Sequence, residues 1–462
     1  MKSNVANLLD KNKDYIAVVG LGKTGLSCIR FLKGKGFVVK VTDSRAKPPG
    51  FDLMLSEFSD VELFLGEFSE AVLMNAQKII LSPGVSLKEP AIQKAQAVGV
   101  PVVGDIELFC AEIDAPIIAI TGSNAKSTVT DLVGRMMFDA GLHVCVGGNL
   151  GTPALSLLGN EAEVYVLELS SFQLETTHAL NAVVATILNI SEDHLDRYDH
   201  MLEYQKAKYR IFRGCKKAVL NRDDSLSSPL LPPSVSQITF GAGIPGDKQF
   251  GLMIVEGETY LAFQGKPIFP QKKLHIAGLH NALNALAALA IGYQFGLSIP
   301  VMINTLSIYH GLPHRCQWVT QFKGVDWYND SKGTNVGATL AAIKGLGESH
   351  PLGKIVLIAG GVGKGADFTS LQAPLHSFAR EVILMGKDAP LIYEAIKNHT
   401  ACYFATNLRD AVQRAALIAE KGDSVLLSPA CASFDMFSGY EERGDQFVKA
   451  VFAEEQAFST AI

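Results

Sequence analysis

Short apolar runs alternate with segments of helical spacing along most of the chain. The first run covers residues 16–20, and a helical pattern over residues 23–35 and a second β-rich run over residues 38–43 follow it. Strands that alternate with helices in this way form parallel sheets with helices on their faces. The pattern therefore predicts an α/β fold.

This alternation begins three times, which predicts three domains, and a length of 462 residues is sufficient for three cores. We expect a Rossmann-like domain over residues 1–104, a central parallel-sheet domain over 105–311 and a second Rossmann-like domain over 312–462. Residues 217–275 shift towards β structure. They predict a small β subregion in the central domain, with a hairpin around Glu256-Gly257-Glu258 and a further β segment in KKLHIAG.

Composition and charge exclude several classes of protein. With 48% hydrophobic residues, 19% charged residues and a net charge of −5, the chain is expected to be globular and not to bind nucleic acid. Seven scattered cysteines without a CxxC pair are typical of reduced thiols, and the N-terminus has no apolar signal segment, so we expect a cytoplasmic protein. Residues 285–303 lack charge, but Gly292, Gly296 and Pro300 interrupt them, which predicts two helices and no membrane span.

The segment AITGSNAKSTVT, residues 119–130, connects an apolar strand to a helix. Backbone N–H groups at such a helix N-terminus bind phosphate, Lys126 adds a positive charge, and the Ser127 hydroxyl suits Mg²⁺. A Walker A motif requires glycine at the positions of Ile120 and Ala125. Taken alone, the segment therefore fits a phosphate loop and an ordinary strand–turn–helix about equally well.

Two further polar side chains follow apolar strands of the central domain. Glu168 ends the strand VYVLE, and His194 follows the strand that begins near residue 182. The carboxyl ends of parallel strands meet at one edge of a sheet, so we expect both side chains to converge on the phosphate loop. A carboxylate there favours a magnesium site, whereas His194 alone fits an ordinary polar loop as well. Asn149 fits both a helix cap and a substrate contact.

The N-terminal domain holds a GxGxxG turn at residues 20–25, with Asp43 at the end of the second strand. This arrangement is close to a dinucleotide-binding fingerprint, in which the acid binds a ribose hydroxyl. The glycines and the helix N-terminus recognise a diphosphate and not nicotinamide itself, so the turn fits NAD and other diphosphates alike. A second loop, Ser82-Pro83-Gly84, follows another strand at the same edge of the sheet.

Two polar features lie further along the chain. Asn281 and Asn284 stand one turn apart on an apolar helix, where they share a face and bind either local backbone or a ligand. Lys364 lies in the glycine-rich segment GGVGKG after a strand, where it is placed either in a flexible loop or against an anion.

Together these motifs resemble the Mur ligase family, which builds the peptide stem of peptidoglycan. The resemblance covers nearly the whole chain and rests on segments in the family's order: TGSNAKST, ELSSFQLE, SEDHLDRY, YQKAK, HNALNALAA, GLPHRCQWV, NDSKGTN and GGVGKGADF. The GLGKTG and SPG motifs and the ending LLSPACASFDMF are similar to those of members that add D-glutamate. The resemblance implies that the first domain binds UDP, the second ATP and the third the amino acid.

The resemblance also implies a reaction. We expect ATP-dependent addition of D-glutamate to UDP-N-acetylmuramoyl-L-alanine through an acyl phosphate, with ATP and two Mg²⁺ ions. The product would serve cytoplasmic peptidoglycan synthesis, and hence cell-wall biogenesis, cell shape and cell division. The expected partners are these small molecules, without nucleic acid or membrane, and the chain is expected to act as a monomer.

The family's functional residues fall on identifiable positions of this sequence. The implied catalytic residues are Lys126, His194 and a carbamylated Lys208, with Lys206 as the alternative lysine. The implied metal ligands are Ser127, Glu168, His194 and Lys208. The implied ATP-binding residues are Gly122, Ser123, Asn124, Ala125, Lys126, Ser127, Thr128, Asn281, Asn284, Arg315, Asp330 and Lys332. The implied UDP-substrate residues are Gly22, Lys23, Thr24, Ser44, Arg45, Ser82, Asn149, Gln173 and His194. The implied D-glutamate residues are Thr334, Lys364, Ser433 and Phe434.

Two positions depart from the family's pattern. Ala125 replaces a glycine, so the loop is strained if that position needs a positive φ, and Val362 replaces an aspartate. Three alternative functions remain: another Mur-type amino-acid ligase, an NAD-dependent oxidoreductase supported by the turn at residues 20–25, and an ATP-binding regulatory module without enzymatic activity. Only the first of these alternatives uses both the YQKAK and the GGVGKGADF segments.

Overall fold

The structure is a computed structural model that describes residues 9, 14–193, 197–276, 278–349 and 352–460. Its tertiary contacts divide the chain into two compact units. The first unit comprises Met1–Gly241, Gly246–Phe250 and Ala287–Met302, and the second comprises Ala242–Pro245, Gly251–Leu286 and Ile303–Ile462. The contacts do not test the expected domain boundaries at 104/105 and 311/312, which stay predictions.

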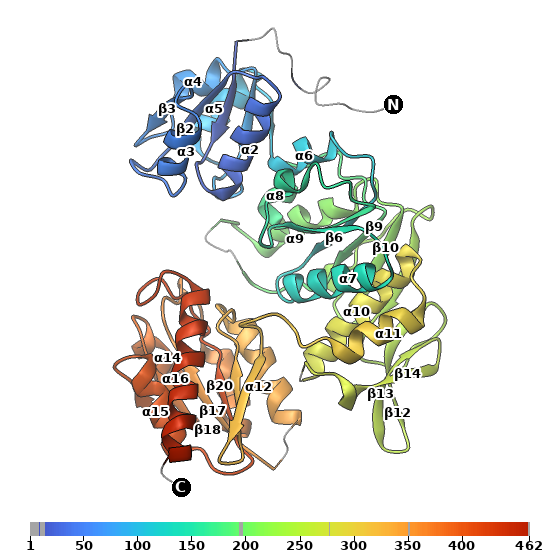
Figure 1. Cartoon of the computed structure of the whole chain (residues 1–462), viewed down its shortest axis with the longest axis vertical. Coiled ribbons are helices and arrows are strands. Elements are labelled where there is room, and N and C mark those ends of the chain that lie inside the picture. The colour runs from blue at the N-terminus through green and yellow to red at the C-terminus, as the bar shows by residue number, and fades with distance from the viewer. Residues whose placement is uncertain (1–8, 10–13, 194–196, 277, 350–351, 461–462) are drawn as a thin grey trace. The chain divides into compact units, whose positions relative to one another are not determined.

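The N-terminal part, drawn in blue in Figure 1, contains a parallel five-stranded sheet. The order of its strands is β3-β2-β1-β4-β5. Its strands are β1 (Ile16–Val19), β2 (Val39–Asp43), β3 (Glu62–Leu65), β4 (Lys78–Leu81) and β5 (Val102–Val103). Its helices are α2 (Lys23–Gly34), α3 (Phe51–Glu57), α4 (Glu70–Met74) and α5 (Pro90–Ala97). Because β1 pairs with both β2 and β4, the loops after these strands meet at one edge of the sheet.

Alternate residues of this sheet pack into two cores, one on each face. Ile16 and Val18 belong to the core that includes helices α2 and α3, whereas Ala17 and Val19 pack with α4 and α5. Both faces of the strands are therefore apolar, which is why the sequence of residues 16–19 is a continuous apolar run.

The central sheet has nine strands in the order β14-β13-β12-β11-β10-β9-β6-β8-β7. Strand β6 lies between β8 and β9, so the loops after these three strands are neighbours. The strands are β6 (Ile117–Thr121), β7 (Val144–Gly148), β8 (Val164–Glu168), β9 (Val184–Ile187), β10 (Lys217–Asn221), β11 (Ser236–Phe240), β12 (Gln249–Val255), β13 (Glu258–Phe263) and β14 (Lys266–Pro270). The helices are α6 (Asp105–Cys110), α7 (Lys126–Asp139), α8 (Ser171–Glu175), α9 (Met201–Tyr209), α10 (Leu279–Phe295) and α11 (Ile299–Ile308).

The third sheet has the order β15-β16-β20-β17-β18-β19, with β15 antiparallel to its neighbour and the other pairs parallel. Helices α12, α13 and α14 pack on one face and α15 and α16 on the other. The strands are β15 (Gln317–Phe322), β16 (Val325–Asn329), β17 (Ile355–Ala359), β18 (Ala379–Leu384), β19 (Ala401–Phe404) and β20 (Ser424–Leu427). The helices are α12 (Val336–Ser349), α13 (Gln372–Phe378), α14 (Ala389–Ile396), α15 (Leu408–Ile418) and α16 (Tyr440–Thr460).

The short elements that complete the fold are 3-10 turns. They are η1 (Ala154–Leu157), η2 (Arg210–Phe212), η3 (Ser225–Ser227), η4 (Gln271–Lys273) and η5 (Thr369–Leu371).

The β subregion agrees with the sequence in one place and differs in another. The predicted hairpin is confirmed, because Glu256 and Gly257 both have positive φ, of 52° and 82°, between β12 and β13. The prediction of a β segment at KKLHIAG is wrong, since Gln271–Lys273 form the turn η4 and the strand precedes it as β14.

The uncharged segment at residues 285–303 forms parts of two helices, α10 and α11, as predicted. Among the described residues, no helix is both long and apolar enough to cross a membrane.

The turn between β1 and α2 requires glycine at the first and third of its glycine positions, Gly20 and Gly25, but not at the second, Gly22. A Cβ built on Gly25 would lie 2.0 Å from the Gly20 carbonyl oxygen, whereas one built on Gly22 meets nothing within 4 Å. Gly20 itself has a φ of +89°, which other residues rarely adopt. The shape of the turn is therefore fixed by close contact between Gly20 and Gly25.

We predict that Gly25→Ala lowers the free energy of unfolding by about 1–3 kcal/mol, because the added methyl group clashes with the Gly20 carbonyl. Gly34→Ala is the matched control in the same helix, where a Cβ meets nothing within 4 Å. Alanine there should leave stability unchanged or raise it by about 0.5–1 kcal/mol. Urea unfolding of both variants measures the difference, and a Gly25→Ala protein as stable as the wild type would contradict the close contact.

Candidate functional site

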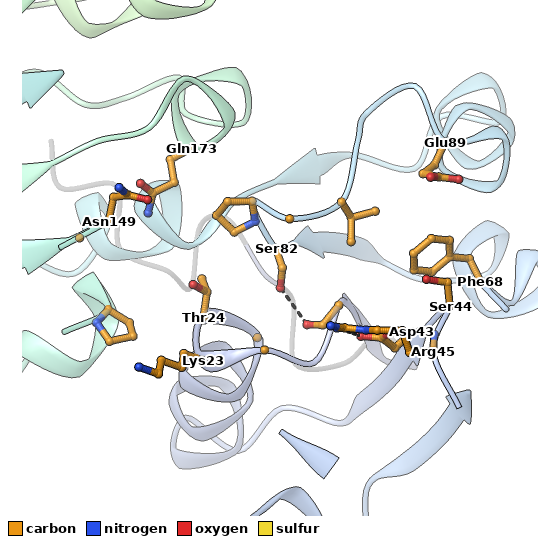
Figure 2. Close-up of a pocket in the computed structure, with 18 of the residues that line it drawn as sticks. Lys23, Thr24, Asp43, Ser44, Arg45, Phe68, Ser82, Glu89, Asn149 and Gln173 are labelled. Atoms are coloured by element: carbon orange, nitrogen blue, oxygen red, sulfur yellow. Dashed lines mark hydrogen bonds and ion pairs between the residues drawn. The ribbon is translucent and has the colours of Figure 1, made fainter. Parts of the chain in front are cut away.

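A cavity of about 530 Å³ lies at the carboxyl edge of the first sheet, within the first compact unit (Figure 2). The described residues predicted for the UDP substrate all line it: Gly22, Lys23, Thr24, Ser44, Arg45, Ser82, Asn149 and Gln173. His194, which was predicted with them, lies outside the described residues. The structure thus brings together loops that are up to 150 residues apart in the sequence.

Asp43, the acidic residue of the dinucleotide-like motif, accepts hydrogen bonds from neighbouring residues of the chain. Asp43 accepts hydrogen bonds from the Leu21 backbone N–H at 2.7 Å, from the Arg45 backbone N–H at 2.9 Å and from Arg45 Nε at 2.8 Å. Burial alone would raise the pKa of Asp43, but the bonds from Arg45 and Leu21 hold it below its usual value. Both carboxylate oxygens are thereby engaged, which counts against the ribose contact that the NAD alternative requires.

Charged side chains lie at different ends of the cavity. Lys23 and Asn149 lie on one side of the cavity, whereas Glu89 lies on the other side, with Phe68 and Ser44 (Figure 2). Phe68, Glu89 and Pro153 line the cavity without belonging to any recognisable motif, so the sequence did not identify them.

The predicted phosphate loop joins β6 to α7 and is fixed by the loop after β9. The Ser123 backbone N–H donates to the Asn189 carbonyl at 2.9 Å, and the Asn124 backbone N–H donates to Asn189 Oδ1 at 2.8 Å. Ala125 has a φ of 64° at the N-cap of α7, which confirms the strain expected of an alanine at a glycine position. A left-handed alanine costs about 1–2 kcal/mol.

Two oxygen-bearing side chains meet beside this loop, as predicted. Ser127 Oγ donates to Glu168 Oε2 at 2.5 Å, and Asn149 Nδ2 donates to Glu168 Oε1 at 2.6 Å. A hydroxyl and a carboxylate are hard oxygen donors, so this pair fits a magnesium ion. Among the described residues, no cluster of three or more His, Cys, Asp or Glu side chains is placed to bind a metal.

Two lysines hydrogen-bond to one carbonyl of the phosphate loop. Lys126 Nζ donates to the Gly122 carbonyl at 2.9 Å, and Lys208 Nζ donates to the same oxygen at 2.8 Å. Lys208 is almost fully buried and stands over the Tyr204 ring at 4.6 Å. Burial first, and then the charge of Lys126, hold the pKa of Lys208 well below its ordinary value.

The neighbouring lysine lies in a different environment. Lys206 is exposed on the same helix, so the structure brings Lys208 and not Lys206 to the phosphate loop. Asn189 and Tyr204 were missed as parts of this site. Tyr204 belongs to the YQKAK segment, and its hydroxyl lies 3.2 Å from Ser123 Oγ.

The second unit contains the remaining residues predicted for ATP. Asp330 follows β16 and accepts hydrogen bonds from the Cys316 backbone N–H at 3.1 Å and from Ser428 Oγ at 2.7 Å. Burial raises the pKa of Asp330 to about 6. Lys332 Nζ stands 3.7 Å from the centre of the Tyr440 ring. Arg315 immediately precedes Cys316, and so belongs to the same turn.

The two amides of α10 share a face, as expected. Asn284 Nδ2 donates to Asn281 Oδ1 at 3.1 Å, so the pair is satisfied partly within the helix. Asn281 is buried, which distinguishes it from the half-buried Asn284.

The residues predicted for D-glutamate lie in loops of the third sheet. Val362 and Ala432 exchange two backbone hydrogen bonds of 2.9 Å, which joins the loop of Lys364 to the loop of Ser433 and Phe434. Lys364 and Phe434 are exposed, whereas Ser433 is buried. Val362 therefore acts here through its backbone, although the family's aspartate is missing. Thr334 lies in the turn after Asp330, where its backbone N–H donates to the Lys332 carbonyl at 2.7 Å.

A buried carboxyl group lies behind Gln173, one of the cavity residues. Asp105 Oδ2 accepts a hydrogen bond from Gln173 Nε2 at 3.1 Å, and Gln173 also forms a capping box with Ser170. Asp105 Oδ1 has no hydrogen-bond partner among the described residues. Burial raises the pKa of Asp105 from 3.8 to about 6. The amide of Gln173 is thus oriented from two sides.

Comparisons with known proteins cover almost the whole chain. Models of three families match in succession: Mur ligase MurD-like, N-terminal domain, at residues 14–104; Mur ligase middle domain, at residues 120–292; and Mur ligase, glutamate ligase domain, at residues 314–431. The UDP-N-acetylmuramoylalanine–D-glutamate ligase of Pseudomonas putida is 53% identical over 433 residues, covering 94% of this chain and 96% of the relative. The enzyme of the same name from Nitrosococcus oceani is 50% identical over 435 residues, covering 94% and 95%.

Solved structures share the fold at much lower identity. A pseudomurein peptide ligase type C from Methanothermus fervidus has a TM-score of 0.60 at 19% identity, covering 95% of this chain and all of that one. The UDP-N-acetylmuramate–alanine ligase of Thermotoga maritima has the same TM-score and identity, covering 95% and 99%.

We predict that Asp105→Asn makes the protein more stable above pH 6 but not below pH 4. A raised pKa means that the wild type loses about 3 kcal/mol as the pH rises from about 4 through 6, since the buried carboxyl must ionise. Asparagine does not ionise and can still accept the bond from Gln173. Urea unfolding of both proteins at pH 4 and pH 8 tests this. Parallel stability–pH curves would show that Asp105 does not titrate in this range.

Proposed function

The chain belongs to the Mur ligase family, and from this we propose that it adds D-glutamate to UDP-N-acetylmuramoyl-L-alanine with ATP. The curated relatives described above carry the name of this activity at 50–53% identity. The observation that carries the proposal is the meeting of Lys126, the Ser127–Glu168 pair and the buried Lys208 at one phosphate loop. An NAD-dependent oxidoreductase would have no use for these groups.

The reaction needs an activated carboxyl group. The terminal carboxylate oxygen of the L-alanyl substrate attacks the γ-phosphorus of ATP, ADP leaves, and an acyl phosphate forms. The amine of D-glutamate then attacks the carbonyl carbon, loses a proton and expels inorganic phosphate. Both steps depend more on positioning and charge neutralisation than on covalent catalysis by the protein.

The proposed roles at the phosphate loop follow from its contacts. Lys126 would neutralise the γ-phosphate, and the backbone from Gly122 to Thr128 would hold the other phosphates. Ser127 and Glu168 would hold magnesium, which supplies charge neutralisation at the transferring phosphoryl group. A second ion, with His194 and Lys208 among its ligands, is part of the proposal.

Lys208 is suited to carbamylation. The ammonium group would first lose one proton to give the neutral amine. The amine nitrogen would then bond to the carbon of CO₂ and lose a second proton, so a cation would become a carbamate anion. Only the neutral amine reacts, and the lowered pKa of Lys208, caused first by burial, favours that form. The carbamate would accept hydrogen bonds. Its negative charge would also attract Lys126, whose positive charge repels a protonated Lys208.

The other predicted residues take the remaining parts of the substrates. We propose that the cavity lined by Arg45, Ser82 and Asn149 holds the UDP-sugar. Asn281, Asn284, Arg315, Asp330 and Lys332 would contact the nucleoside of ATP, and Thr334, Lys364, Ser433 and Phe434 would contact D-glutamate. The enzyme is proposed to act in the cytoplasm as a monomer.

Phosphate release tests the function directly. The full chain, ATP, Mg²⁺ and UDP-N-acetylmuramoyl-L-alanine are mixed with D-glutamate, L-lysine or diaminopimelate in separate reactions. We expect phosphate release only in the reaction that contains D-glutamate, and not in those with L-lysine or diaminopimelate. Release with L-lysine or diaminopimelate instead would indicate another Mur-type ligase, and ATP binding without release would favour the regulatory module.

The Lys208→Ala variant tests the proposed carbamate. It should lose at least about 100-fold of the phosphate-release rate, and added formate or acetate should restore part of that rate by replacing the missing anion. Lys206→Ala is the matched control on the same helix and should retain the wild-type rate. Wild-type activity in Lys208→Ala, or a loss that short carboxylates do not restore, would rule out the carbamate.

A further inference from the structure

Arg443 is a buried arginine in the first turn of α16, and its side chain is 1% exposed. Its guanidinium donates three hydrogen bonds, each to a neutral oxygen. Nε donates to Ser331 Oγ at 3.0 Å, Nη2 to the Ser331 carbonyl at 2.8 Å and Nη1 to the Cys431 carbonyl at 3.2 Å. The guanidinium therefore joins two loops that are 100 residues apart in the sequence.

This cation is buried without a compensating ion pair. In the part of the chain that the structure describes, no carboxylate lies within ion-pair distance of Arg443, and the charges of the more distant Asp435 and Asp330 favour its charged form without outweighing burial. Burial lowers the pKa of Arg443 to about 10, so the group is still charged at neutral pH. Burying an unpaired charge is costly, and hydrophobic side chains of similar size commonly replace buried ions without loss of stability. A contribution to stability alone is therefore a weak explanation for Arg443.

The two loops that Arg443 joins are those assigned to different substrates. Ser331 lies between Asp330 and Lys332, which we place at the nucleotide, whereas Cys431 precedes Ser433 and Phe434, which we place at D-glutamate. Ser331 Oγ also donates to the Tyr440 carbonyl at 2.8 Å, which ties the first loop to the start of α16.

A second contact between these loops does not involve a side chain. The Ala430 backbone N–H donates to the Gly333 carbonyl at 2.9 Å. The bond from Ser428 Oγ to Asp330 also joins the two segments, but neither contact involves Ser331 or Cys431. The planar guanidinium is what fixes the oxygens of both residues in one geometry.

We propose that Arg443 is a positioning residue that holds the Asp330–Lys332 turn and the Cys431–Phe434 loop in register. Through this, it sets the position of the incoming amino acid relative to the nucleotide. The inference rests on the proposed function, because that assigns the two loops to their substrates. Arg443 touches neither substrate in this scheme and acts only through the loops.

Arg443→Lys is the first variant to test. A lysine keeps the positive charge but has no planar fork with which to reach the oxygens of both Ser331 and Cys431. We expect the KM for D-glutamate to rise at least about tenfold and that for ATP about fivefold. The KM for UDP-N-acetylmuramoyl-L-alanine should stay within about twofold, because its cavity belongs to the first unit.

Arg414→Lys is the matched control in the same sheet. Arg414 makes two bonds to Glu381, of 2.8 and 2.7 Å, away from both loops. Its substitution should change thermal stability without changing any KM by more than about twofold. Ser331→Ala is a milder variant that removes the two hydroxyl contacts, to Arg443 Nε and to the Tyr440 carbonyl, and keeps the bond from Arg443 to the Ser331 carbonyl. It should raise the KM for D-glutamate about threefold, and it can be measured even if Arg443→Lys does not fold.

Four results would overturn the inference. The first is a folded Arg443→Lys enzyme with wild-type KM values. The second is an equal rise of all three KM values in Arg443→Lys, and the third is a rise of the KM values in Arg414→Lys equal to that in Arg443→Lys. With an unfolded Arg443→Lys protein, a wild-type KM for D-glutamate in Ser331→Ala would be decisive. A wild-type chain that releases no phosphate with D-glutamate would instead reject the proposed function, and this inference with it.

Discussion

The Gly122 carbonyl accepts hydrogen bonds from two lysines, and the arrangement of the first unit's polar site depends on this shared oxygen. Lys126 begins α7 and Lys208 lies on α9, so the oxygen ties two helices to the end of strand β6. Two ammonium groups this close repel each other, and the more deeply buried one loses its proton more easily. The loop is thus held by one charged amine and one that is readily neutralised, which explains how a lysine can be fully buried there.

The second unit uses a buried cation in a similar setting. Arg443 is surrounded by a hydroxyl and two backbone carbonyls, just as Lys208 binds a carbonyl and the Thr121 hydroxyl. In both places a long basic side chain reaches from a helix to the loops at the carboxyl ends of parallel strands. The difference lies in chemistry, because a guanidinium stays protonated whereas burial lowers the pKa of an amine and favours its neutral form.

Much of this architecture could be predicted from the sequence, because each buried parallel strand leaves a continuous apolar run that ends at a loop. The meeting of Ser127 and Glu168 follows from strand ends alone, and the strain at Ala125 follows from its place in the loop. The prediction of a β segment at KKLHIAG was wrong because a short run of mixed polar and apolar residues fits a strand and a turn equally well. Arg443 and Asp105 carry no motif, since their importance arises only from tertiary contacts with Ser331 and Gln173.

The charges around the cavity at the carboxyl edge of the first sheet are unevenly distributed. Asp43 and Arg45 form an ion pair, which leaves Lys23 as a cation on the side of Asn149 and Glu89 as an anion on the side of Phe68. An elongated ligand whose anionic groups lie nearer one end would experience a field along the cavity's length. It would therefore be favoured in one of its two end-to-end orientations. The cavity can in this way select the direction in which a ligand enters before any specific hydrogen bond forms.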